Sequence, residues 1–178
     1  VIAKVSFPLI AEVQNEKERM KSIYSRLISH TMFISIFLMM FVSSISESLI
    51  LIILGAEWII SATYLKLLCF VGLMYPIHSL NLNLLKVKGS SSLFLFLEII
   101  KKIVSLPILL VAWKFGILYL IYSIIIYNII GFFINCLWSG KFVELGAFKQ
   151  INLFWKVFCI SMFSYIIVNL FLNNIFLN

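Results

Sequence analysis

The sequence contains one stretch on which its fold depends, SSSLFLFLEIIKKIVSLPILLVAW, residues Ser90–Trp113. As a helix this stretch would be ~36 Å long, against a bilayer hydrocarbon core of ~30 Å. Glu98, Lys101 and Lys102 nevertheless lie near its middle. A charge at that depth costs on the order of 3 kcal/mol, so it normally faces a bundle interior or a wet cavity. We therefore expect a membrane span that carries part of a functional site.

The composition of the whole chain is that of a membrane protein. Its 178 residues are 63% hydrophobic and 12% charged, and the mean hydropathy is +1.12. A soluble domain is about half apolar and a quarter charged. The fold class predicted is therefore all-α, a polytopic membrane helical bundle. The net charge of +7 follows the loops rather than forming a stripe, so no nucleic-acid partner is expected. The three cysteines lack metal-ligand spacing, and neither a metal nor a cofactor is predicted.

Alternation of apolar runs with short polar turns predicts five complete spans. They cover residues 27–54, 59–85, 90–113, 117–138 and 153–172. Residues 1–11 resemble the end of a further span, and the first residue is Val, so we expect a fragment whose first span is cut. Residues 12–26 are charged with an apolar helical spacing, which predicts an interfacial amphipathic linker. Within the span of residues 59–85, Gly72 and Pro76 are expected to interrupt and kink the helix.

Basic residues are distributed unequally between alternate loops. Ten of those counted fall on one side and only Lys66 and Lys114 on the other. The ten are Lys4, Lys17, Arg19, Lys21, Arg26, Lys86, Lys88, Lys141, Lys149 and Lys156. Cytoplasmic loops carry the excess of lysine and arginine in membrane proteins. The heavier side is therefore predicted to be cytoplasmic.

The charges of residues 90–113 suggest an anion site. Glu98 lies three and four residues before Lys101 and Lys102, on one helix face, in a polar stripe with Ser91 and Ser105. We expect Lys101 to reach a cavity and bind an anion such as a diphosphate, and Lys102 to pair with Glu98. Two structural alternatives are a Glu–Lys clamp between helices and lysines that extend toward the cytoplasmic surface.

The spans of residues 59–85 and 117–138 carry further polar candidates. His78 is a possible proton carrier or, more simply, a hydrogen-bonded packing residue. Asn81 and Asn83 point to opposite sides of a helix, so at most one should face a cavity while the other makes an interhelical hydrogen bond. In the span of residues 117–138, Asn128, Gly131 and Asn135 share one face, which is typical of helix–helix contact. The candidate substrate-binding residues are therefore Glu98, Lys101, Lys102, His78, Asn81 and Asn83. No catalytic constellation is evident, and no enzyme is predicted.

Several segments in order resemble one family. They are Phe7-Pro8 before a charged linker, the Leu54-Gly55-Ala56-Glu57-Trp58 turn, Tyr75 to His78, Leu80 to Lys86, Leu97 to Lys102, and Ser139-Gly140-Lys141. Together they resemble the Wzx-like polysaccharide flippases of the MOP superfamily, a family with two helical lobes around a central cavity.

The resemblance implies that this chain is most of the second lobe of a two-lobed MOP/MATE-type transporter. It also implies partners: an undecaprenyl-pyrophosphate-linked oligosaccharide, membrane lipids, and the missing N-terminal lobe of the same transporter. The location implied is the bacterial cytoplasmic membrane.

Three alternatives are open. A cation-coupled multidrug or small-solute antiporter of the same superfamily would need intramembrane carboxylates, for which Glu98 is the one good candidate. A polysaccharide polymerase should show a large external loop with polar catalytic residues, which the predicted topology lacks. The third alternative is a nonfunctional truncated remnant.

Overall fold

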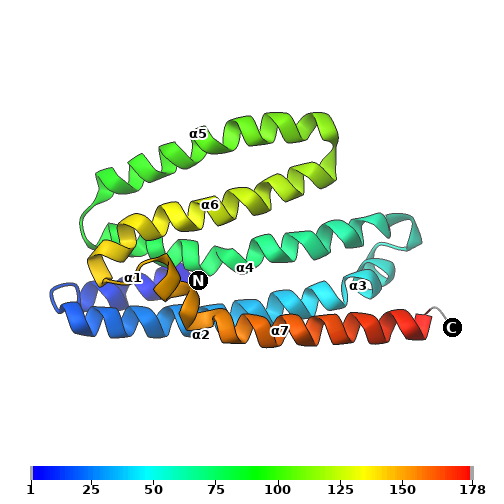
Figure 1. Ribbon diagram of the computed structural model, residues 1–178, viewed down its shortest axis with the longest axis horizontal. Helices are drawn as coiled ribbons and strands as arrows, with labels where there is room; N and C mark the ends of the chain where they lie inside the picture. The colour runs from blue at the N-terminus through cyan, green and yellow to red at the C-terminus, as the bar shows by residue number, and fades with distance from the viewer. Residues whose placement is uncertain (1, 177–178) are drawn as a thin grey trace.

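The computed structural model describes residues 2–176, and the regular structure in that range is helical (Figure 1). Its elements are α1 (Ile2–Glu12), α2 (Lys17–Ser44), α3 (Ser46–Ile53), the 3₁₀ turn η1 (Ala56–Trp58), α4 (Ile60–Val87), α5 (Ser91–Phe115), α6 (Ile117–Val143) and α7 (Ala147–Phe176). The all-α prediction is confirmed.

Four helices in the described residues are long and apolar enough to cross a membrane: α2, α4, α6 and the Ala147–Leu170 part of α7. This count supports the prediction of a polytopic membrane protein. The 25-residue α5 is as long as these helices but carries Glu98, Lys101 and Lys102 in its middle. Reporter insertions on either side of α5 test whether this helix also crosses the bilayer.

The long helices pack in a row rather than in a closed ring. α7 packs on α2, α2 on α4, α4 on α6, and α6 on α5, so that α5 and α7 form the two edges (Figure 1). α5 and α6 make a hairpin through Gly116, whose φ of +98° is a conformation open to glycine. The short α1 lies against α4.

The core lies chiefly between α2 and α4. On α2, Tyr24, Ile28, Met32 and Ile36 are fully buried at a spacing of four residues, which makes one continuous face. The facing residues of α4 follow the same helical period: Leu73, Ile77, Leu80 and Leu84. The other faces of the long helices expose large apolar side chains, as expected of helices surrounded by lipid.

The N-terminal part of α2 corrects one prediction. Lys17 to Ser44 is a single helix, so residues 17–26 continue directly into the span instead of forming a separate interfacial helix. The reason is that Met20 and Tyr24 continue the buried face of Ile28 and pack into the same core. The helix ends at Ser44, and the apolar residues after it form the separate short helix α3.

Helix α4 corrects part of a second prediction, because Gly72 and Pro76 do not interrupt it; the kink stays a prediction. The helix is continuous from Ile60 to Val87 with Pro76 inside. In the turn before Pro76, Ser35 of α2 donates a hydrogen bond to the Leu73 carbonyl (3.4 Å), which ties α4 to α2 at this point. Gly72 has a packing role: a β-carbon there would lie 3.0 Å from Met39 Sδ, so glycine lets α2 and α4 approach closely.

The α6–α7 connection is shorter than the predicted polar loop of residues 139–152. α6 extends to Val143 and α7 begins at Ala147. Glu144 adopts the left-handed conformation (φ 54°), and the Leu145 amide donates back to the Gly140 carbonyl (3.1 Å). This arrangement is a Schellman motif, which ends a helix by satisfying its last carbonyls.

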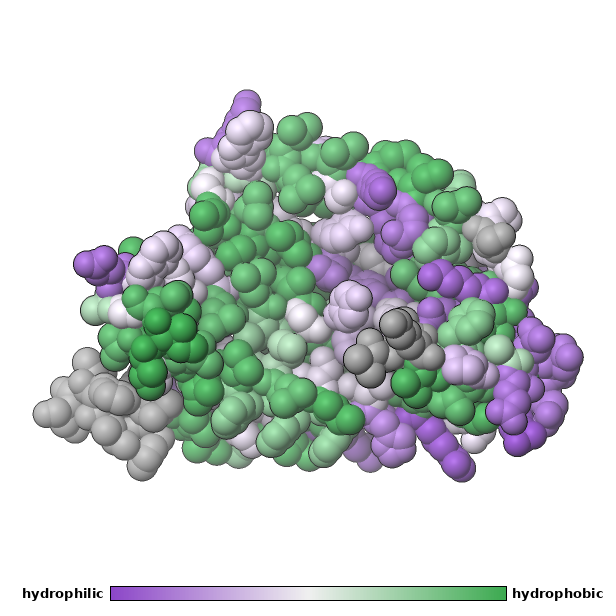
Figure 2. All heavy atoms as spheres, turned by 180° about the vertical axis from the view of Figure 1, so that it is seen from behind, coloured by the Kyte–Doolittle hydropathy of each residue, from purple (hydrophilic) through white to green (hydrophobic). Residues whose placement is uncertain are grey.

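The connections α1–α2, α4–α5 and α6–α7 lie at the same end of the molecule (Figure 1). Figure 2 shows hydrophilic residues gathered at this end and a largely apolar surface along the helices. Most of the ten basic residues counted in the sequence belong to these connections or the adjoining helix ends. We call this region the basic end.

Candidate functional site

The ion pair between Glu98 and Lys101 lies on the side of α5 that faces its neighbours. The Lys101 ammonium contacts a Glu98 carboxylate oxygen, and only 9% of the Lys101 side chain is exposed, against 35% for Glu98. Lys102 is exposed. The expectation that Lys102 would pair with Glu98 is therefore wrong. Adjacent helical residues diverge by ~100°, and α6 covers the side of α5 that carries Lys101.

Because Gly131 of α6 has no side chain, the Lys101 side chain can lie against α6 at this position. A β-carbon at Gly131 would lie 3.6 Å from Lys101 Cδ and 3.5 Å from His78 Cε1 of α4. This residue is thus a helix contact, as its spacing in the sequence suggests. It is also the point where α4, α5 and α6 bring their polar side chains together.

His78 is the contribution of α4 to this junction. Its Nδ1 lies 3.1 Å from Asn135 Nδ2, and the tautomer decides which group donates. Within the described residues, His78 Nε2 and Asn135 Oδ1 make no hydrogen bond of good geometry, although the Asn128 backbone lies near the ring. Lys101 and Glu98 are close enough to act on the ring electrostatically. We call His78, Glu98, Lys101 and Asn135 the polar cluster.

Asn81 occupies a different place, at a junction of four helices. Its Oδ1 accepts hydrogen bonds from Tyr24 Oη (2.8 Å), from Ser139 Oγ and from Gln150 Nε2 (3.2 Å). Its Nδ2 donates to Gln150 Oε1 (3.1 Å) and to the Ile77 carbonyl (3.0 Å). The four side chains are buried. Asn81 therefore ties α4 to α2, α6 and α7, and we call it the hub of this polar network.

Tyr24, Ser139 and Gln150 were not predicted to be site residues or partners of Asn81. Tyr24 has the spacing of an apolar core face, and Ser139 and Gln150 fall in a segment predicted to be a loop. The one available signal is that each is a polar residue next to apolar residues at helical spacing. That signal does not identify partners, because the partners are far apart in the chain.

Asn83 points away from the hub, as the helical period predicts. Its Nδ2 donates to Ser6 Oγ of α1 (2.9 Å), and both side chains are buried. Both asparagines thus make interhelical hydrogen bonds. Of the six predicted site residues, the structure brings together His78, Glu98 and Lys101, and it places Lys102, Asn81 and Asn83 elsewhere. The side chain of Ser91, part of the predicted polar stripe, lies outside the described residues.

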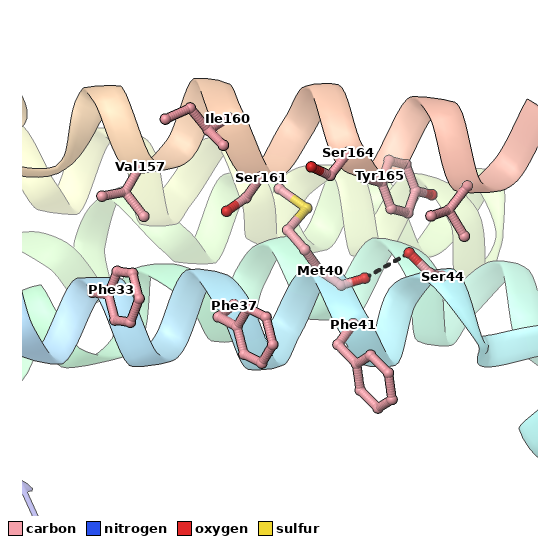
Figure 3. A pocket seen from close by; sticks show the side chains of 11 residues that line it. Phe33, Phe37, Met40, Phe41, Ser44, Val157, Ile160, Ser161, Ser164 and Tyr165 are labelled. Atoms are coloured by element: carbon pink, nitrogen blue, oxygen red, sulfur yellow. Dashed lines mark hydrogen bonds between the residues drawn. The ribbon is translucent and has the colours of Figure 1, made fainter.

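A separate apolar groove of about 440 Å³ runs between α2 and α7. Figure 3 shows Phe33, Phe37 and Phe41 projecting from successive turns of α2, with Ser161 and Ser164 of α7 across the groove. None of the six predicted site residues lines this groove. It belongs to the apolar lateral surface and is distinct from the polar cluster.

Comparisons with known proteins give two similarities. Residues 1–63 match a family described as "Polysaccharide biosynthesis protein". The chain is also similar to an "Uncharacterized membrane protein in cps region" of Klebsiella pneumoniae, with 25% identity over 109 residues. No solved structure matches the chain.

The curated relative is much longer than this chain. The aligned part covers 61% of the chain but 22% of the relative, so the match spans about a fifth of the relative's length. Together the two similarities support a membrane protein of polysaccharide biosynthesis. The polysaccharide flippases that the sequence resembles fall within this broader class of proteins.

Proposed function

We propose that this chain is part of a transporter that flips undecaprenyl-pyrophosphate-linked oligosaccharide repeat units across the bacterial cytoplasmic membrane for polysaccharide export. One observation carries the proposal: Lys101 is 7% exposed within a helical membrane protein and is held beside His78 and Gly131. The similarity to proteins of polysaccharide biosynthesis supports the same substrate class.

The chemistry of the polar cluster suits a diphosphate headgroup that must pass through an apolar medium. A buried ammonium is stable only when it is paired, and in the present arrangement Glu98 is its partner. A diphosphate entering the cluster would compete with Glu98 for Lys101 and form charge-assisted hydrogen bonds with it. His78 Nε2 and Asn135 Oδ1, which make no other hydrogen bond of good geometry in the described residues, could bind hydroxyl groups of the sugar.

The position of α5 at one edge of the row suggests how a cavity would be completed. Apart from Lys102 and a few other polar residues, the surface of α5 that neither α4 nor α6 covers is apolar. Its exposed side chains include Leu95, Ile99, Ile103, Leu106 and Leu110. In the proposed transporter, a second lobe of the same polypeptide closes the cavity.

The test is made in the full-length protein that contains this chain, with surface polysaccharide and membrane protein level measured together. Lys101→Ala is expected to lower export at least tenfold, and Lys101→Arg to retain part of it, because a cation remains. Lys102→Ala is the matched control on the adjacent residue and should export normally, since Lys102 is exposed.

A variant that removes both charges separates function from stability. Lys101→Ala strands Glu98 in a partly buried site, which can lower the amount of folded protein. The double variant Glu98→Gln with Lys101→Met has no stranded charge and should restore the protein level without restoring export. Normal export by this double variant would refute the anion site.

The antiporter alternative rests on Glu98. Its carboxylate is half-buried and close enough to influence the His78 ring. Efflux of small cations that is abolished by Glu98→Gln, with polysaccharide export unaffected in the same cells, would favour that alternative over the flippase.

A further inference from the structure

A second groove lies between α6 and α7 at the basic end. It has a volume of about 530 Å³ and is distinct from both the polar cluster and the α2–α7 groove. Its lining combines apolar side chains with charged ones. The lining residues with the longest side chains are Phe133, Leu137, Phe148, Lys141, Lys149 and Glu144. We call it the α6–α7 groove.

The charged residues of the groove gather at one end. Lys141, in the last turn of α6, is exposed with its ammonium 4.6 Å from the centre of the Trp138 ring. Lys149, in the first turn of α7, is exposed and donates to the Glu144 carbonyl (3.3 Å). The negative end of the α6 dipole and the positive end of the α7 dipole both lie here, so the positive charge comes from the two lysines.

One acidic side chain also lines the groove, and its charge is partly balanced. The Glu144 carboxylate lies 3.8 Å from the Lys21 ammonium of α2, outside the groove. Lys141 and Lys149 therefore leave a net positive charge at this end of the groove. That charge is complementary to a phosphate.

The apolar side chains lie farther along α6, in the direction of the hydrocarbon core. Phe133 and Leu137 are two turns and one turn before Lys141, and 40% and 67% of their surfaces are exposed. Eight residues of helix separate Phe133 from Lys141 by ~12 Å. Trp138 between them is a residue type typical of the membrane interface. The groove thus changes from cationic at headgroup level to apolar at acyl-chain level.

We propose that the α6–α7 groove binds an anionic phospholipid of the surrounding bilayer. The phosphate lies between Lys141 and Lys149, and an acyl chain packs along Phe133 and Leu137. Basic pockets between membrane helices at the cytoplasmic side are suited to anionic headgroups. This site does not depend on the proposed transport activity and involves none of the residues of the polar cluster.

The experiment uses the full-length protein in nanodiscs that contain equal parts of phosphatidylglycerol and phosphatidylcholine. The lipid that stays bound after gentle extraction is measured by native mass spectrometry. Phosphatidylglycerol should be retained over phosphatidylcholine, and Lys141→Gln with Lys149→Gln should reduce its retention about tenfold or more. Equal retention of the two lipids by the unmodified protein would overturn the proposal.

Two controls distinguish a defined site from general attraction to positive charge. Lys86→Gln with Lys156→Gln removes the same charge from exposed lysines outside the groove and should leave retention unchanged. Leu137→Trp fills the groove without changing charge and should lower retention several-fold. An equal loss in both double variants, or no effect of Leu137→Trp, would contradict the site.

A final arm separates a phospholipid from a free anion. Excess inorganic phosphate should not displace bound phosphatidylglycerol, because phosphate makes no contact with the apolar part of the groove. Complete displacement by phosphate would show an adventitious ion only. Thermal unfolding of each variant, measured in the same detergent, verifies that differences in retention do not reflect unfolded protein.

Discussion

At the scale of single residues, the buried polar side chains have two different uses. The side chains of Lys101 and His78 both lie next to Gly131. In this region His78 Nε2 and Asn135 Oδ1 are buried without a hydrogen bond of good geometry. Asn81, in contrast, is fully engaged by partners on three other helices. A fully satisfied buried network makes a structure rigid, whereas an unpaired buried polar group is costly. This difference indicates a stabilising role for the hub and supports the proposal that the polar cluster binds a ligand.

The hub leads to a prediction about stability. Asn81→Leu would leave the buried hydroxyl groups of Tyr24 and Ser139 without their acceptor, whereas Gln150 keeps its bond to the Leu145 carbonyl. Each unsatisfied buried group costs about 1–3 kcal/mol, so the free energy of unfolding should fall by at least about 2 kcal/mol. Chemical unfolding in detergent, followed by circular dichroism, measures the change.

Asn128→Leu is the control for this prediction. Asn128 is only half-buried, and its Nδ2 donates to Ile124 of its own helix (2.8 Å). The substitution removes the same amide without separating helices and should change stability by less than about 1 kcal/mol. If both leucine variants were equally stable, the hub would have no special role.

At the scale of elements, glycine determines how closely the helices and turns can approach. Gly72 lets α2 and α4 pack against each other, and Gly140 lets the α6–α7 turn fold back over the end of α6. Neither feature can be recognised from local propensity, because a glycine inside a helix ordinarily weakens it. Here Gly72 instead makes room for the Met39 side chain of α2, and Gly140 for the backbone of the following turn.

The α6–α7 turn provides a matched pair of substitutions. At Gly140 a β-carbon would lie 2.8 Å from the Leu145 carbonyl oxygen and 3.1 Å from Gly146 Cα, so alanine must displace the backbone of the turn. At Gly146 a β-carbon would meet nothing within 4 Å. We expect Gly140→Ala to lower the midpoint of thermal unfolding by several degrees and Gly146→Ala to leave it unchanged. A fluorescence-monitored thermal shift of the purified full-length protein compares the two; similar midpoints would show that the turn has room to relax.

At the scale of the whole molecule, the row of helices has a basic end and an apolar lateral surface. The α1–α2, α4–α5 and α6–α7 connections share one end, which is where the loops of greater positive charge belong if successive long helices cross the bilayer. Helix α5 is the deciding element. It has the length of a span, yet because of its central charges it is not among the four helices that are apolar enough to cross a membrane.

Reporter insertions on either side of α5 test its topology. Inserted after Lys88 and after Gly116 in the full-length protein, they should report opposite sides of the membrane, the first cytoplasmic. A helix of 25 residues is ~38 Å long and can cross a hydrocarbon core of ~30 Å. The same side for both insertions would show that α5 does not cross, and the polar cluster would then lie at the surface.

The sequence by itself determined the class of the protein and the approximate position of its long helices. Hydropathy and helical period are local properties, so Ser90–Trp113 is recognisable as a helix with charges at its centre without any knowledge of its neighbours. The pairing of Glu98 with one of two lysines also followed from spacing alone. That the residues from Lys17 onward form one helix with the following span did not follow from the sequence. Their apolar face is short, and its stability comes from packing into the core.

Only the tertiary structure decided which polar residues meet. Lys101 rather than Lys102 pairs with Glu98, since the side of α5 that carries Lys101 is the one that packs against α6. Asn81 became a hub through partners 57 to 69 residues away in the chain. Helical period indicates the direction in which a side chain points. It does not indicate what lies there, because that depends on how helices distant in sequence pack in space.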